Sequence, residues 1–180
     1  GFAPFIDTNP DCCEGEKYKA VGAQCRSTQG FLWAMVSPDG IRWELMREEP
    51  IITDGKFDSQ NLSFWDAKRR EYRAYIRDFH SYSDHYSSGI RGIKTATSKD
   101  FKDWSDPVWL EYPEAPNEQL YTNQIYPYYR APHLFIGFPT RYTEREWTPA
   151  LENLSEFDER KRRADFHMRY GTAVTDNLFM

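Results

Sequence analysis

Short apolar runs separated by polar turns recur along the chain, a pattern that predicts β-strands rather than long helices. Residues 56–79 are a clear example, because Trp65, Tyr72, Tyr75 and Ile76 form the apolar side of a predicted hairpin. The pattern predicts further strands at 16–21, 31–36, 42–48, 70–75, 91–97, 107–112 and 132–138. We therefore expect an all-β protein.

A turn motif occurs twice between these strands. The sequences SPDGIRW at 37–43 and SKDFKDW at 98–104 both have the form Ser-x-Asp-x-x-x-Trp. Aspartate with a neighbouring turn residue favours reversal of the chain. A tyrosine-centred strand also recurs, as EKYKAV at 16–21 and REYRAY at 70–75, and PHLFIGF at 132–138 is a plausible third copy.

Together these features define a repeat of about 55 to 60 residues that contains four antiparallel strands, as in β-propeller blades. The predicted blades span approximately 1–50, 51–113 and 114–180, within one partial propeller domain. A closed propeller needs at least about four blades. We therefore expect either that the chain is a piece of a longer protein or that it self-associates through open blade edges.

One segment, 148–166, does not follow the repeat. Pro149 suits the first turn of a helix, apolar residues recur at three-residue spacing, and Glu–Arg pairs lie four residues apart. These features predict one surface helix near 149–163, with the basic run at 160–163 on its solvated face. The residues after it, RYGTAVTDN at 169–177, predict a strand that leads into a third turn of the Ser/Thr-x-Asp type.

Each predicted blade opens with a carboxylate beside amide side chains. These groups are Asp7 with Asn9, Asp58 with Gln60 and Asn61, and Glu118 with Gln119, Asn123 and Gln124. In a propeller the first strand of each blade borders a central channel, so we expect the three carboxylates to converge there. The alternative is that these polar residues satisfy local backbone groups at turns.

Converging carboxyl groups and amides suit carbohydrate chemistry. Cleavage of a glycosidic bond needs one carboxylic acid and one carboxylate, and neighbouring carboxylates raise the pKa of one another. Amides can bind sugar hydroxyls, and aromatic rings offer flat apolar faces; the aromatic candidates are Tyr121, Tyr126, Tyr142, Trp33 and Trp65. Arg141 can hold a sugar hydroxyl or carboxylate, and a plain surface role is equally open.

The chain also resembles a known group of enzymes. The segments that carry the resemblance are FIDTNP, SPDGIRW, FDSQNLSFWD, REYRAYIRDF, TATSKDFKDW and EQLYTNQIYPYYRAPHLFIGFPTRY. Together they resemble the five-bladed β-propeller glycoside hydrolases of the family 32 and 43 clans, especially uncharacterised bacterial members. The resemblance covers nearly the whole chain.

This resemblance implies roles for the three carboxylates. Glu118 would be the general acid, Asp58 would tune the pKa of that acid, and Asp7 would be the base, unless the base lies upstream of Gly1. The Arg-Asp-Pro form of the middle motif is absent, because Ser59 follows Asp58. The resemblance also implies a secreted or periplasmic location, although no signal peptide is visible in the chain.

Bulk properties exclude other partners. The chain has 180 residues and a formal net charge of −5 at pH 7. Nucleic acids and anionic membranes require a basic face, so this charge argues against both. No apolar run approaches the length of a membrane span. We expect a carbohydrate substrate and no cofactor.

Two groups of potential metal ligands do not form a metal-binding pattern. Cys12, Cys13 and Cys25 lack metal-type spacing, and we expect free thiols, with a disulfide to Cys25 as the alternative. His80 and His85 lie with two aspartates in a segment rich in Ser and Tyr, where we expect a solvent-exposed loop rather than a metal site.

A second class of function stays open on the sequence. A propeller can bind a glycan or a protein through its channel face without catalysis, because binding needs only amides and aromatic rings. A hydrolase instead needs two carboxyl groups that face one cavity at a separation of roughly 5–10 Å.

Overall fold

The computed structural model describes residues 1–26, 29–80, 89–116 and 118–180, with side chains at 24–29 outside that description. The first sheet is an antiparallel meander in which strands adjacent in sequence are paired. Its strands are β1 (Phe2–Ile6), β2 (Tyr18–Arg26), β3 (Gln29–Ser37) and β4 (Glu44–Leu45).

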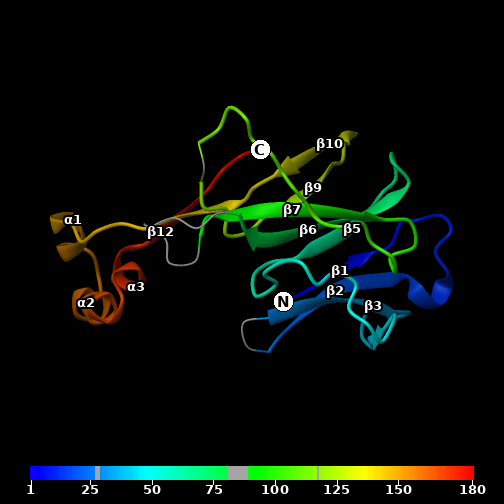
Figure 1. Cartoon of the computed structure of the whole chain (residues 1–180), viewed down its shortest axis with the longest axis horizontal. Helices are drawn as coiled ribbons and strands as arrows, with labels where there is room; N and C mark the ends of the chain where they lie inside the picture. Colours follow the sequence, from blue (N-terminus) through cyan, green and yellow to red (C-terminus); the bar gives the residue numbers. More distant parts are fainter. Residues whose placement is uncertain (27–28, 81–88, 117) are drawn as a thin grey trace.

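A second meander repeats this topology and lies beside the first (Figure 1). Its strands are β5 (Leu62–Asp66), β6 (Glu71–Phe79), β7 (Arg91–Ser98) and β8 (Val108–Trp109). The first strands of the two meanders, β1 and β5, are in contact. The repeated four-stranded unit predicted from the sequence is therefore present twice.

The remaining strands differ from the predicted third four-stranded unit. They form a β9–β10 hairpin and a separate β11–β12 pair, with bounds β9 (Ile125–Tyr128), β10 (Ala131–Gly137), β11 (Thr140–Thr143) and β12 (Val174–Asn177). The chain end returns alongside β10, where Gly137 and Met180 exchange backbone hydrogen bonds of 2.9 and 3.0 Å. The long segment between β11 and β12 separates strands that the repeat would place close together in sequence.

That segment forms three short α-helices, α1 (Pro149–Glu152), α2 (Phe157–Phe166) and α3 (Met168–Thr172). The prediction of one helix near 149–163 was wrong because the chain breaks after α1, where Glu156 adopts a positive φ of 57°. The strand expected over 169–177 is also shorter than predicted, since its first residues belong to α3. The helices project from the sheets at one end of the molecule (Figure 1).

The two Ser-x-Asp turns have the same hydrogen bonds. Ser37 Oγ accepts the backbone N–H of Gly40 at 2.9 Å, and Ser98 Oγ accepts that of Phe101 at 2.9 Å. Each turn tryptophan donates its indole N–H to the residue three positions earlier, at 3.1 Å in both turns. Local side-chain bonds therefore fix the repeated turn.

The core lies on both faces of the second meander. Along β6, Tyr72, Ala74 and Ile76 face a cluster shared with the first meander, whereas Tyr75 belongs to a second cluster with Ile125 of β9. This alternation follows from the two-residue period of a strand. The second meander is thus the central layer, which brings β9 and its preceding segment close to β7.

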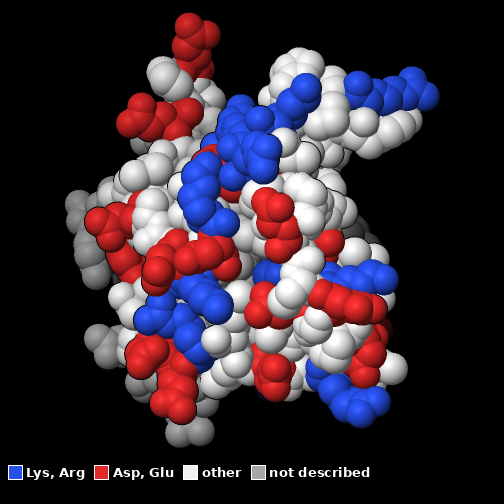
Figure 2. All heavy atoms as spheres, turned by 90° about the vertical axis from the view of Figure 1, so that its right-hand side faces the viewer, with Lys and Arg blue, Asp and Glu red and all other residues white. Residues whose placement is uncertain are grey.

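The described residues form an all-β arrangement of antiparallel sheets with few helices and without a closed barrel or ring. Within that same part of the chain, no helix is long and apolar enough to cross a membrane. The end of the molecule at the right of Figure 1 carries Lys and Arg side chains interspersed with Asp and Glu side chains (Figure 2).

Candidate functional site

The three predicted blade openings do not occupy equivalent positions. Asp58 and Glu118 precede β5 and β9, but Asp7 follows β1. The start of β1 lies beside the Asp58 segment, because a Cβ placed on Gly1 would be 3.1 Å from the backbone oxygen of Ser59. A strand rises about 3.3 Å per residue, so Asp7 is roughly 20 Å from that end of β1.

Asp7 instead takes part in a buried network between the two meanders. Its Oδ2 atom lies 2.8 Å from Lys19 Nζ and accepts the Tyr72 hydroxyl at 2.7 Å. Burial alone would raise the pKa of Asp7, but hydrogen bonds from Lys19, Tyr72 and the Asn9 backbone outweigh it and lower that pKa. Asn9 donates its side-chain amide to the Tyr72 hydroxyl at 3.1 Å. Both residues therefore join β1 to β6.

Two of the predicted sugar-binding amides bind backbone instead. Asn61 is 4 % exposed and donates to the backbone oxygens of Phe57 and Ser59. Asn123 is fully buried and donates to those of Gln60 and Tyr75, at 3.1 and 3.2 Å. Asn61 therefore satisfies local backbone groups, as the alternative drawn from the sequence expected, whereas Asn123 binds backbone groups that are distant in sequence.

Asp58 lies at the end of the second meander and forms an ion pair with Arg77 of β6. The Arg77 side chain is almost completely buried, whereas the Asp58 side chain is 63 % exposed. The guanidinium of Arg77 lies over two rings, 5.0 Å from the centroid of Phe79 and 5.8 Å from that of Tyr121. A buried cation thus holds one exposed carboxylate at this end of the sheet.

Arg91 opens β7 next to Arg77. Its guanidinium lies 5.3 Å from the ring centroids of both Phe79 and Tyr121 and 4.9 Å from that of Tyr142. One of its N–H groups donates to Gln119 Oε1 at 2.5 Å. Burial, and then the charge of Arg77, lower the pKa of Arg91 from its ordinary value.

Glu118 and Arg141 extend this arrangement toward β11. Arg141 Nη1 lies 3.0 Å from Glu118 Oε1, and Arg141 also forms two hydrogen bonds with Asp176 of β12. The rings of Tyr121 and Tyr142 are 5.9 Å apart. Arg141 therefore bridges a carboxylate from each of two chain segments.

Backbone bonds of the segment before β9 hold these side chains together. Leu120 donates to Arg91 O at 3.1 Å, Tyr121 donates to Thr140 O at 2.7 Å, and Tyr142 donates to Gln119 O at 2.8 Å. The segment therefore joins β7 to β11 like a short strand. We call the resulting group the arginine–aromatic cluster: Asp58, Arg77, Phe79, Arg91, Glu118, Gln119, Tyr121, Arg141 and Tyr142.

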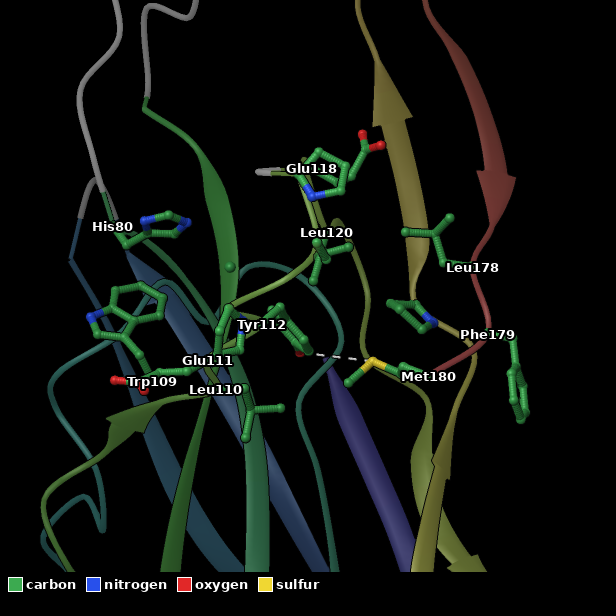
Figure 3. Close-up of a pocket in the computed structure, with 15 residues that line it drawn as sticks. His80, Trp109, Leu110, Glu111, Tyr112, Glu118, Leu120, Leu178, Phe179 and Met180 are labelled. Carbon is green, nitrogen blue, oxygen red and sulfur yellow. Dashed lines mark hydrogen bonds between the residues drawn. The ribbon is translucent and has the colours of Figure 1, made fainter.

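A cavity of about 600 Å³ lies beside the cluster. It is lined mainly by apolar side chains of β8, the segment after it and the chain end, with Glu118 and His80 at its edge (Figure 3). Inside it the Tyr112 hydroxyl points to Met180 Sδ at 3.8 Å. Burial, with a smaller contribution from Tyr75, raises the pKa of Tyr112 to about 12. Glu118, a site residue predicted from the sequence, belongs to the cluster and also lines this cavity.

Several other candidates have structural surroundings. The Trp65 ring packs on Tyr72, with 4.8 Å between ring centroids, and His80 packs on Trp109. Gln124 is exposed and has a positive φ of 48°. His85 and the side chain of Cys25 lie outside the described residues.

The described residues hold no group of three or more His, Cys, Asp and Glu side chains placed to bind a metal. Arg77 and Arg91, the two buried cations of the cluster, were not among the residues predicted from the sequence. The available signal was an arginine within the predicted hairpin at 56–79 and another at the start of the predicted strand at 91–97, because charged residues are seldom buried without a partner.

No protein-family model matches the chain, and no curated protein matches it. Among solved structures, the chain is similar to a crystal structure of an N-acetylgalactosamine deacetylase from F. plautii in complex with blood group B trisaccharide. The TM-score is 0.51 at 11 % sequence identity, over 69 % of this chain and 41 % of the other. The likeness therefore concerns the fold, and the chain spans about two fifths of the length of that structure.

Proposed function

We propose that the chain belongs to a carbohydrate-active protein of the propeller type and that it binds glycan at the arginine–aromatic cluster. The observation that carries this proposal is the Tyr121 ring, which is 40 % exposed and lies beside the guanidinium groups of Arg77 and Arg91. A flat apolar ring next to fixed hydrogen-bond donors suits a sugar, which has apolar ring faces and equatorial hydroxyls.

Two further observations support the propeller type and the carbohydrate role. The two four-stranded meanders carry the same Ser-x-Asp turn with the same hydrogen bonds, as expected for successive blades. The structural neighbour is a deacetylase of N-acetylgalactosamine with a trisaccharide bound. A shared fold does not carry an activity with it, so the cluster itself has to support the function.

The more specific proposal is cleavage of a glycosidic bond with Glu118 as the general acid. Glu118 Oε1 is engaged by Arg141, so Oε2 is the oxygen on which a transferable proton would reside. Asp58 is the second carboxylate of the site, in the role of binding a sugar or tuning the acid. Asp7 has no part in this proposal, because it lies at the other end of β1 in an ion pair with Lys19.

A non-catalytic glycan-binding module is the second candidate. Asp58 and Glu118 each form an ion pair with an arginine, and Asp176 binds the same Arg141 as Glu118. Binding needs no proton transfer, so this candidate is compatible with both ion pairs.

Hydrolysis and binding assays on four proteins separate these candidates. Wild type, Glu118→Gln, Tyr121→Ala and Glu152→Gln would be assayed on a panel of aryl glycosides and, in parallel, titrated with the same glycans. Glu152 is exposed on α1 and serves as the matched control. We expect Glu118→Gln to abolish hydrolysis and retain binding, while the control behaves as wild type.

Other results decide against one proposal or both. Full activity in Glu118→Gln would place the acid elsewhere. Binding without hydrolysis by wild type would favour the non-catalytic module. Binding that survives unchanged in Tyr121→Ala would contradict the cluster as the glycan site.

A further inference from the structure

Four cationic side chains are buried in the described part of the chain: Lys19, Arg77, Arg91 and Lys94. Three of them have carboxylate partners. Lys19 pairs with Asp7, Arg77 pairs with Asp58, and Lys94 pairs with Asp54 and Asp78 at 2.9 and 2.8 Å. Arg91, which is 8 % exposed, has no carboxylate partner among the described residues.

An unpaired buried charge is costly, because the low-dielectric interior replaces its hydration poorly. The rings around Arg91 compensate in part through cation–π contacts. The neutral Gln119 oxygen supplies one hydrogen bond. The positive charge of Arg91 is therefore only partly compensated, whereas carboxylates neutralise the charges of the other three buried cations.

The unpartnered polar atoms around Arg91 are mostly donors. Arg91 Nε, Arg77 Nε and Gln119 Nε2 are all buried without a hydrogen-bond partner. The two guanidinium groups share the Phe79 and Tyr121 rings, so these donors occupy one neighbourhood. Buried donors that lack acceptors, next to an unpaired positive charge, fit an incoming anion.

We propose that the arginine–aromatic cluster selects a sugar that carries a negative charge, with Arg91 binding its carboxylate or sulfate group. This inference rests on the proposed function, because it names the class of glycan. Tyr121 lies beside both guanidinium groups and is exposed, so a ligand that displaces its ring can reach them. The planar guanidinium fork matches the two oxygens of a carboxylate or sulfate.

Three methyl glycosides that differ in the charged group they carry test this inference. Methyl β-glucuronide, methyl β-glucoside and a sulfated methyl glucoside would be titrated calorimetrically into the 180-residue chain. We expect a charged sugar to bind at least about tenfold more tightly than the neutral one, the factor that one good charged contact supplies. Tight binding of the sulfated sugar alone would support the inference with sulfate as the charged group.

Variants locate the effect. Arg91→Gln should reduce binding of the charged sugar to the level of the neutral one, and Arg91→Lys should retain part of the preference, since it keeps the charge but loses the fork. Arg130→Gln is the matched control, because Arg130 is exposed and bonds to the Tyr129 hydroxyl, away from the cluster. Its affinities should equal those of wild type.

Two results overturn the inference and separate it from the proposed function. Equal affinities for charged and neutral sugars, both lost in Tyr121→Ala, would refute the charge preference and leave glycan binding in place. An unchanged preference in Arg91→Gln would also refute it. No binding of any sugar would count against both proposals.

A thermal-unfolding assay covers the case in which Arg91→Gln does not fold. Ligands that bind the native state raise its melting temperature. The charged sugar should therefore raise the melting temperature of wild type more than the neutral sugar does at the same concentration. Equal shifts would contradict the inference without any variant.

Discussion

Phe101 occupies the same position in the second Ser-x-Asp turn that Gly40 occupies in the first, and both residues have a positive φ, 68° and 74°. A phenylalanine in this region is strained by about 1–2 kcal/mol. Its side chain is fully buried and contacts the rings of Phe5, Tyr72 and Trp104, with centroids 5.7, 5.1 and 5.5 Å away. The strained turn therefore places an aromatic ring between the two meanders.

Replacing Phe101 by glycine tests whether the strain of its backbone or the burial of its ring has the larger effect on stability. Phe101→Gly relieves the strain but removes a buried aromatic side chain, a loss of about 3–5 kcal/mol. We expect the free energy of unfolding, measured with urea, to fall by about 2–4 kcal/mol. In contrast, Gly40→Ala should cost only about 1 kcal/mol, mainly through its positive φ. A more stable Phe101→Gly protein would show that the ring contributes little.

The Asp7–Lys19 pair should be far more important for stability than an exposed pair. Lys19→Met leaves the Asp7 carboxylate buried without its cation, a change that typically costs about 3–5 kcal/mol. Arg42→Met is the matched control, since Arg42 is 88 % exposed and pairs with Asp39 on the surface. Its effect should be under about 1 kcal/mol. Similar effects of the two variants in urea unfolding would contradict the structural role given to Asp7.

The Asp7–Lys19 pair should also make the stability of the fold depend on pH. Because the folded-state pKa of Asp7 lies below its ordinary value of 3.8, Asp7 stabilises the fold above that pH and loses this contribution as the pH falls further. The pKa of Lys19 is raised above 10.5, so its contribution is complete below that pH and declines above it. The stability difference between wild type and Asp7→Asn should therefore be constant near neutrality and shrink below about pH 4. A difference that grows on acidification would contradict the assignment.

Gly171 is predicted to be essential for packing between α2 and α3. A Cβ atom at this position would lie 2.3 Å from the backbone oxygen of Arg160 and 2.7 Å from the Ala164 side chain. Gly171→Ala should therefore destabilise the helical region by about 1–3 kcal/mol, as overpacking does. Limited proteolysis would detect this as faster cleavage within 149–172.

Gly15→Ala provides the control, because a Cβ at Gly15 meets nothing within 4 Å. It should leave both proteolysis and stability nearly unchanged. Equal protease resistance of Gly171→Ala and wild type would show that the helices are not held at this contact.

The repeated meander could be predicted from the sequence because its determinants are local. Ser37 and Asp39, like Ser98 and Asp100, bond to backbone groups within three residues, so seven residues suffice to specify the turn. The region after β10 could not be predicted in the same way. Its strand β11 pairs with β12 across three helices, and no local pattern identifies that partner.

The site was only partly predictable for a related reason. Glu118, Tyr121 and Arg141 were candidates from the sequence, and they lie together in the cluster. Arg91 comes next to Arg77 only through the pairing of β6 with β7, in which Arg91 lies opposite Phe79. Asp7 was predicted at the opening of a blade, but it follows the end of β1. Only its contacts with Lys19 and Tyr72 show that it joins the two meanders.

The most direct test of the account is to locate a bound glycan on the protein by NMR. Backbone amide shifts of the labelled chain would be followed while methyl β-glucuronide is added, with methyl β-glucoside as the comparison. We predict that the largest changes occur at Arg77, Arg91 and 119–121, and that they are larger for the charged sugar. Changes confined to the 600 Å³ cavity around Trp109 and Leu178, or to the hairpin end near Asp7, would contradict it.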